Sequence, residues 1–118
     1  MSHDIQLNDP NTDQCLILDE PHLMRGGNYQ IGGEQYAYLN VTYNYTDIFR
    51  RVIGGKGITT IYGKSGAESV PILESAIALL GDDVNPDYWK ATEGNVKRAL
   101  IHLLALAQMR PDGVWVGD

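Results

Sequence analysis

The chain of 118 residues carries 15 acidic and nine basic side chains, so its formal net charge is −6 and its isoelectric point lies near 4.8. This charge balance argues against general nucleic-acid binding, which needs a basic surface that displaces counterions. No apolar run approaches the roughly 18 residues of a membrane-spanning helix, and the single cysteine, Cys15, excludes an internal disulfide. We therefore expect a single domain over residues 1–118, without membrane contact, in a reducing compartment such as the cytoplasm.

The first 14 residues are polar and contain the turn-forming sequence Asn-Asp-Pro-Asn-Thr-Asp, so we expect a loose N-terminus and no signal peptide. Residues 15–18, Cys-Leu-Ile-Leu, predict a short buried strand, which Pro21 should end. Two Gly-Gly pairs follow within residues 25–36 and indicate a tight turn or hairpin that leads into the next strand.

Residues 36–45 carry the clearest strand pattern in the chain. Tyrosine, asparagine and threonine side chains alternate along it with mostly apolar ones, at a period of two. Leu39, Val41 and Tyr43 are expected to face the core. Residues 57–63 are rich in β-branched side chains and bounded by glycine, so they predict a second short strand.

Helical spacing of apolar side chains predicts three helices. The first covers residues 46–53, with Thr46 as N-cap and Gly54 at its end. The second covers about residues 69–80, and the third runs for about 18 residues after the N-cap Thr92. A short helical turn is expected at residues 85–89. Gly94 lies in the first turn of the last helix, where it costs about 1 kcal/mol relative to alanine. This position indicates that a backbone or a ligand approaches closely, or that the helix begins one turn later.

The order of these elements predicts the fold class. Residues 114–116, Val-Trp-Val, predict a terminal strand after the last helix. Strands, a helix, a strand, two or three helices and a last strand indicate an α+β domain. We expect a small antiparallel or mixed sheet with two to four helices packed on one face.

One segment in the middle of the chain is positive in an otherwise acidic sequence. Between Asp47 and Glu68 the chain holds four basic side chains and no acidic one: Arg50, Arg51, Lys56 and Lys64. Its Gly-Lys-Ser ending is not a phosphate-binding loop of the Walker type, because five residues instead of four separate Gly57 from Gly63, and they are β-branched. A weaker kind of anion site remains open.

This anion site would have two parts. Glycine turns would let backbone N–H groups approach a ligand, and the start of a predicted helix would favour an anion. Nearby tyrosines would stack on a nucleotide base. The candidate ligand-binding residues are Tyr43, Tyr45, Arg50, Arg51, Lys56, Gly57, Lys64 and Ser65. The alternative is a solvated basic face that balances neighbouring carboxylates, with strand tyrosines that serve packing or a protein interface.

The sequence predicts no metal, cofactor or catalytic site. Residues 9–20 match part of the calcium-binding EF-hand register, but a glutamine stands where the loop requires glycine, and too few residues precede it for an entering helix. The cysteine and histidines lack zinc spacing. Cys15 and His22 would need a third group to orient the histidine, and none lies nearby in the sequence. We therefore expect a binding protein more than an enzyme. An enzyme with an unrecognised catalytic site is the less favoured hypothesis.

Three stretches carry a resemblance: "LNVTYNYTDIF", "IYGKSGAES" and "DYWKATEGNVKRALIHLLALA" followed by "PDGVW". They resemble a loose group of small bacteriophage and prophage proteins over about residues 36–116. The resemblance carries over no functional residue. It implies an accessory protein that is made inside a bacterial host cell and that acts by binding.

We therefore expect a non-enzymatic phage-type accessory protein that binds an anionic small molecule of the nucleotide-like kind, such as a signal that it withholds from host defence. Because a chain of this size encloses few deep pockets, the site is expected to be shared between subunits of a homo-oligomer. The alternative is an acidic protein-interaction module that inhibits a host defence enzyme or nuclease through charge complementarity.

Overall fold

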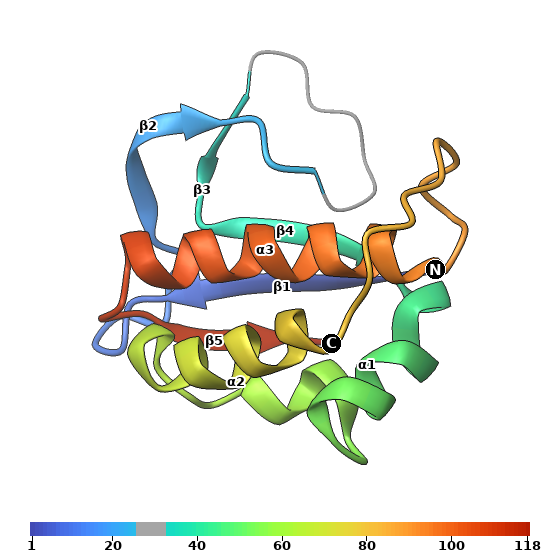
Figure 1. The fold of residues 1–118 in the computed structure, drawn as a ribbon. Coiled ribbons are helices and arrows are strands. Elements are labelled where there is room, and N and C mark those ends of the chain that lie inside the picture. Colours follow the sequence, from blue (N-terminus) through green and yellow to red (C-terminus); the bar gives the residue numbers. More distant parts are fainter. Residues whose placement is uncertain (26–32) are drawn as a thin grey trace.

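The computed structural model describes residues 1–25 and 33–118. In chain order the elements are β1 (Ser2–Asn8), β2 (Ile17–His22), β3 (Glu34–Tyr36), β4 (Tyr38–Thr42), α1 (Thr46–Ile53), α2 (Gly66–Ala78), α3 (Glu93–Met109) and β5 (Val114–Gly117), with 3-10 segments η1 (Tyr43–Tyr45) and η2 (Gly57–Ile61) on either side of α1. The main sheet has the order β4-β1-β5, and α2 and α3 lie on one of its faces (Figure 1). This arrangement confirms the predicted α+β fold.

The N-terminal residues form the centre of the sheet, so the expectation of a loose N-terminus is wrong. β1 pairs antiparallel with β4 on one side and with β5 on the other, and Ile5 lies opposite both Leu39 and Gly117. Ile5 and Leu7 are fully buried beneath the helices. Ile5 and Leu7 alternate with polar residues, which is a strand pattern. The pattern is short and is followed by turn-forming residues, so the sequence predicted a loose terminus for the whole segment.

The second sheet consists of β2 and β3, which pair antiparallel and lie above the β4 edge of the main sheet in the view of Figure 1. β2 continues through Pro21, so the expectation that this proline ends the strand is wrong. Proline is tolerated in an edge strand, where its missing N–H is not required for pairing. The predicted turn between the two Gly-Gly pairs covers residues 26–32, which lie outside the described residues.

The predicted strand at residues 36–45 is confirmed in its central part. Leu39 and Val41 are fully buried, as their spacing predicts. The strand ends at Thr42, whose hydroxyl accepts a hydrogen bond from the backbone N–H of Asn44 at 3.2 Å, and the chain turns there into η1. Tyr43 therefore lies in η1, after the end of the strand, and is half-buried where a core position was predicted.

The predicted strand at residues 57–63 is wrong, because Gly57–Ile61 forms the 3-10 segment η2. Gly57 has a φ of 60°, which interrupts an extended chain and is readily adopted only by glycine. Ile58 and Ile61 are three residues apart, so one turn of 3-10 helix buries both on the same side. β-branched residues here fill the core and do not pair with another strand.

The predicted helices at residues 46–53 and after Thr92 are confirmed, and the middle helix begins one turn earlier than expected, at Gly66. Thr92 accepts a hydrogen bond from the N–H of Asn95, as an N-cap should. Thr46 is instead the first helical residue of α1, and its hydroxyl donates to the Tyr43 carbonyl at 2.6 Å.

Turns replace the predicted helical turn at residues 85–89. The buried Asn95 side chain holds this loop, since its Oδ1 accepts from the N–H of Asn85 and its Nδ2 donates to the carbonyls of Asp87 and Lys90. The close backbone approach predicted from Gly94 is also present. A Cβ at this position would lie 2.6 Å from backbone atoms of the preceding loop.

Candidate functional site

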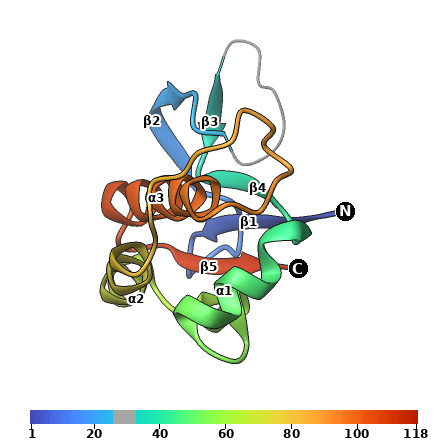
Figure 2. The same cartoon turned by 45° about the vertical axis from the view of Figure 1, so that its right-hand side comes forward.

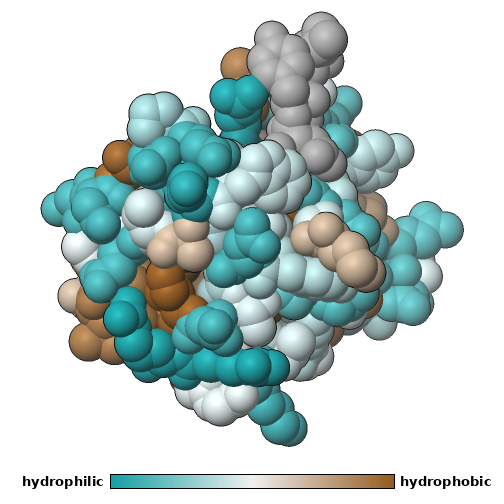
Figure 3. Space-filling model, turned by 90° about the vertical axis from the view of Figure 1, so that its right-hand side faces the viewer, coloured by the Kyte–Doolittle hydropathy of each residue, from teal (hydrophilic) through white to brown (hydrophobic). Residues whose placement is uncertain are grey.

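Three of the predicted ligand residues meet in one cavity. Arg50, Lys56 and Gly57 line a hollow of about 310 Å³ between α1 and η2, which we call the α1–η2 cavity. α1 lies near both chain termini at one end of the molecule (Figures 1 and 2). Seen from that end, the surface is mostly hydrophilic, and apolar atoms gather toward the side of α2 (Figure 3).

The cavity is formed because α1 ends abruptly. Gly54, with a φ of 138°, breaks the helix, and its carbonyl accepts the N–H of Gly57 at 2.8 Å, so the chain folds back under α1. A Cβ on Gly57 would lie 3.3 Å from Cγ of Arg50. The absence of a side chain at this glycine therefore brings η2 close to α1 and places Arg50 and Lys56 on the same cavity.

The four predicted cations differ in their surroundings. Arg51 forms an ion pair with Glu93, with Nη2 and Oε2 3.2 Å apart. Arg50, Lys56 and Lys64 form no ion pair with any residue in the described ranges 1–25 and 33–118. The two arginines also lie in the last turn of α1, where positive charge complements the helix dipole. The positive charge of the segment alone therefore does not define a ligand site, and the other residues that line the cavity matter as well.

His3 is the functional candidate that sequence reasoning missed. It lines the α1–η2 cavity and is only 8% exposed. Its Nδ1 lies 2.8 Å from the main-chain oxygen of Asp118, and its ring packs edge-on against Tyr43 with 4.4 Å between centroids. Its Nε2 is buried and has no hydrogen-bond partner among the described residues. The available signal was the alternation along residues 2–8, which places His3 on the same sheet face as the core residues of β1.

Tyr45 does not serve the predicted stacking role, because it is fully buried. Its hydroxyl donates to the carbonyl of Tyr88, and its ring contacts Phe49 and Tyr88 in the core. Burial raises the pKa of Tyr45, so its phenol stays protonated as a donor. Tyr43 is half-buried and packs against His3. The prediction that Tyr45 stacks on a base is therefore wrong, whereas the stacking role of Tyr43 stays a prediction.

Lys64 and Ser65 lie at the start of α2, and neither lines the α1–η2 cavity. Ser65 forms a capping box with Glu68: the serine hydroxyl accepts the Glu68 N–H at 3.0 Å, and the glutamate carboxylate accepts the Ser65 N–H at 2.9 Å. The backbone hydrogen bond from Ser65 is the main cause that lowers the pKa of Glu68.

The next two amides of α2 are also used. The N–H groups of Gly66 and Ala67 donate to the carbonyls of Gly113 and Pro111, at 2.8 and 3.1 Å. The chain's own carboxylate and carbonyls therefore occupy the helix end where the sequence predicted anion binding. The four cations of the middle segment lie in three places: Arg50 and Lys56 at the cavity, Arg51 beside Glu93, and Lys64 before α2.

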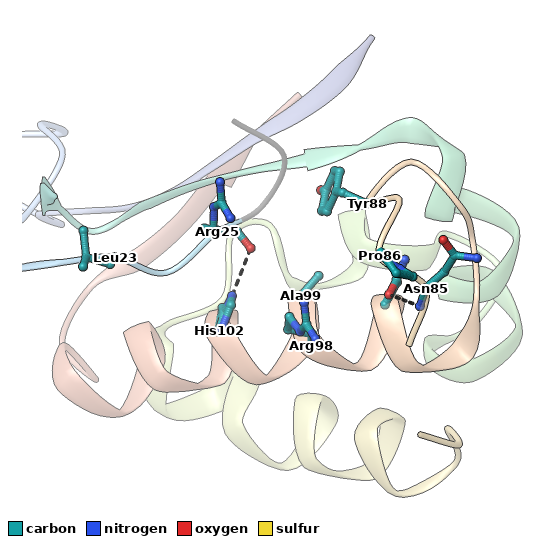
Figure 4. A pocket seen from close by; sticks show the side chains of 9 residues that line it. Leu23, Arg25, Asn85, Pro86, Tyr88, Arg98, Ala99 and His102 are labelled. Carbon is teal, nitrogen blue, oxygen red and sulfur yellow. Dashed lines mark hydrogen bonds between the residues drawn. The ribbon is translucent and has the colours of Figure 1, made fainter. Parts of the chain in front are cut away.

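A second cavity of about 310 Å³ lies beside α3 (Figure 4). Arg98 and His102 reach it from α3, Tyr88 from the preceding loop, and Arg25 from the segment after β2. Nδ1 of His102 lies 3.0 Å from the Arg25 carbonyl oxygen. Burial is the main cause that lowers the pKa of His102, and the charge of Arg98 acts in the same direction.

Within the described residues there is no group of three or more histidine, cysteine, aspartate or glutamate side chains placed to hold a metal ion. None of the helices in the described part of the chain has the length and apolar character needed to cross a membrane. No family model, no curated protein and no solved structure matches the chain. The resemblance to small phage proteins therefore stays a prediction.

Proposed function

We propose that the protein binds a small anionic molecule in the α1–η2 cavity and acts by binding it. The observation that carries this proposal is that Arg50, Lys56 and the buried His3 line one hollow. In a chain with a net charge of −6, two cations without a carboxylate partner in the described residues are an attractive place for an anion.

The size and chemistry of the cavity favour a phosphate- or carboxylate-bearing molecule of few atoms. Its volume of about 310 Å³ is at the lower end of the range for small-molecule sites. A guanidinium such as that of Arg50 donates two parallel hydrogen bonds to a phosphate or carboxylate, and an ammonium such as that of Lys56 adds a point charge. Gly55 and Lys56 both line the cavity, and their N–H groups form no backbone hydrogen bond with the described residues.

The narrower expectation of a nucleotide-like signal finds less support. With Tyr45 buried, the remaining aromatic candidate is Tyr43, whose ring is already engaged with His3. The geometry therefore supports recognition of the phosphate end of a ligand better than recognition of a base. A trap that withholds a nucleotide signal from host defence needs only such binding, and this use stays a prediction.

The proposal is tested by calorimetric titration and thermal unfolding with inorganic phosphate, small phosphate esters and nucleotides. A ligand that binds only the folded protein adds about 2.7 kcal/mol of stability at a hundredfold excess over its dissociation constant. We expect the double substitution Arg50→Glu and Lys56→Glu to abolish binding. Lys64→Glu changes the same kind of charge outside the cavity and should retain most of the affinity.

Two results would refute the proposal. One is that no anion stabilises the native protein. The other is that Lys64→Glu weakens binding as much per charge as the two substitutions in the cavity, since that outcome would show attraction by net charge without a defined site.

A further inference from the structure

We infer that the cavity beside α3 binds a small apolar carboxylate, a molecule with one acidic group on an aromatic ring or a branched chain. This site is separate from the α1–η2 cavity, so the inference goes beyond the proposed function. It depends on two features of the described cavity walls, which are positive charge without an acidic side chain and apolar surface beside that charge.

The first feature is the charge of the walls. Arg25 and Arg98 both line the cavity of about 310 Å³, and none of its described lining residues is acidic. In a chain with a net charge of −6, a wall of this composition stands out from the rest of the surface. A guanidinium donates two parallel hydrogen bonds to a carboxylate, so this wall is suited to an organic acid.

Arg98 is the residue that we assign to the carboxylate. It is exposed on α3, and the three ion pairs within residues 1–25 and 33–118 use other cations. Burial is the main cause that lowers the pKa of His102, and the charge of Arg98 lowers it further. His102 follows Arg98 by one helical turn and lines the same cavity. The guanidinium therefore acts on the cavity side of α3 and has an anion still to bind.

The second feature is the apolar part of the walls. Leu23 lies on one side of the cavity and Pro86 on the other, with Ala99 between them on α3 (Figure 4). The ring of Tyr88 also lines the cavity, and it is held in place because its hydroxyl accepts the N–H of Thr42 at 3.0 Å. A strongly hydrated phosphate would lose water against these side chains without compensation. A ring or a branched chain would instead bury them, so the walls favour an apolar acid.

His102 stabilises the cavity and adds no charge to it at about pH 7.5. Its Nδ1 lies 3.0 Å from the carbonyl oxygen of Arg25, which can only accept a hydrogen bond, so Nδ1 carries a hydrogen. Because burial lowers the pKa of this ring from its usual value of 6.5, the ring is neutral at about pH 7.5. The hydrogen bond joins α3 to the segment after β2 (Figure 4). Two walls of the cavity are therefore already connected before a ligand binds.

The volume of the cavity and the two features of its walls define three matched probes. A volume of about 310 Å³ lies at the lower end of the range for small-molecule sites, so one ring with a short acidic arm is a suitable size. Phenylacetate has both the ring and the carboxylate. Phenylacetamide has the ring without the charge, and acetate has the charge without the ring.

Calorimetric titrations with these probes at about pH 7.5 test the inference. We expect the native protein to bind phenylacetate saturably and about ten-fold more tightly than phenylacetamide, which lacks the hydrogen bonds of a charged group. Acetate should bind at least about ten-fold more weakly than phenylacetate, because it buries no ring. Arg98→Gln should bind phenylacetate no more tightly than phenylacetamide. Lys64→Gln removes the same charge away from the cavity and should keep the native preference.

NMR of the native protein locates the bound acid without a substitution. The aromatic ring of phenylacetate shifts the resonances of protein groups that it contacts. We expect the methyl group of Ala99 and the ring of His102 to shift on addition of phenylacetate and much less on addition of acetate. Shifts centred on residues 55–57 would show that the acid enters the α1–η2 cavity, and they would overturn the inference.

The calorimetric outcomes separate this inference from the proposed function. Absence of saturable phenylacetate binding, or equal binding of phenylacetate and phenylacetamide, would overturn the inference and leave the α1–η2 cavity as a site for phosphate. A preference for phenylacetate that persists in Arg98→Gln would show that the carboxylate is recognised elsewhere. A preference that Lys64→Gln removes as fully as Arg98→Gln would show attraction by net charge, and either result would overturn the assignment of Arg98.

Discussion

A buried hydrogen bond between Ser69 and Trp115 allows the packing between α2 and β5 to be tested quantitatively. Both residues are fully buried; the indole N–H of Trp115 donates to the Ser69 hydroxyl at 2.7 Å, and this hydroxyl donates to the Gly66 carbonyl at 2.8 Å. Ser69→Ala removes the acceptor and leaves the indole N–H buried without a partner. Desolvating such a group without compensation costs about 1–3 kcal/mol.

This cost converts into a measurable change in melting temperature. An unfolding entropy of roughly 2 cal/mol/K per residue gives about 0.25 kcal/mol/K for 118 residues, so Ser69→Ala should lower the melting temperature by about 4–12 °C. Urea unfolding followed by circular dichroism should show a lower midpoint with an unchanged slope. Ser75→Ala, an exposed serine on the same helix, is the matched control and should stay within about 0.5 kcal/mol of the native protein.

A double-mutant cycle identifies the cause of the loss. In Trp115→Phe no indole N–H needs an acceptor, so adding Ser69→Ala to that background should cost clearly less than it does in the native protein. If the two substitutions are simply additive, or if Ser69→Ala behaves like Ser75→Ala, the reasoning from the unsatisfied donor is refuted.

Two further substitutions test other parts of the structure. Gly94→Ala places a Cβ 2.6 Å from the backbone of the preceding loop, so it should destabilise the fold by at least about 2 kcal/mol in urea unfolding. Gly55→Ala, with open space around the new Cβ, should not destabilise the fold. Equal effects of the two substitutions would contradict the close packing at Gly94. The hydrogen bond from Tyr38 is the main cause that lowers the pKa of Asp4, so this carboxylate contributes stability above its unfolded pKa of about 3.9 and loses it as the pH falls toward the lower folded value. Between about pH 7 and about pH 3, Tyr38→Phe should therefore lose less stability than the native protein. If both proteins lose the same stability over this pH range, the coupling between Tyr38 and Asp4 is refuted.

The sequence predicted those elements whose signals are local. α3 begins after the Thr92 cap and α1 ends at Gly54, as the cap residues and the apolar spacing indicate, because each signal acts within one turn of the chain. Gly94 also revealed its close contact, since glycine is otherwise costly in a first helical turn. These elements required no knowledge of their distant partners.

The elements that failed depend on distant residues. β1 is stable as the central strand because it pairs with β4 and β5, which lie far along the chain. Its own seven residues, with two apolar side chains in the core, are too weak a signal to predict that pairing. η2 has the composition of a strand, but its isoleucines are buried by a single 3-10 turn after Gly57. Burial, which depends on tertiary packing, overrode β-propensity here.

The candidate site shows the same division. Composition identified Arg50 and Lys56, because they lie in the positive segment next to its glycines. It could not separate them from Lys64, which the fold carries to the start of α2. It also could not find His3, which reaches the cavity through the register of β1, more than 40 residues away along the chain.

The location of bound phosphate tests the central claim most directly. Two-dimensional NMR of the nitrogen-15 labelled protein, titrated with inorganic phosphate and with glycerol 3-phosphate, reports which backbone amides change their environment. Our account predicts saturable shifts at Gly55, Lys56 and Gly57 together with His3. Shifts centred on the start of α2 or on the cavity beside α3, or no saturable shift anywhere, would contradict it.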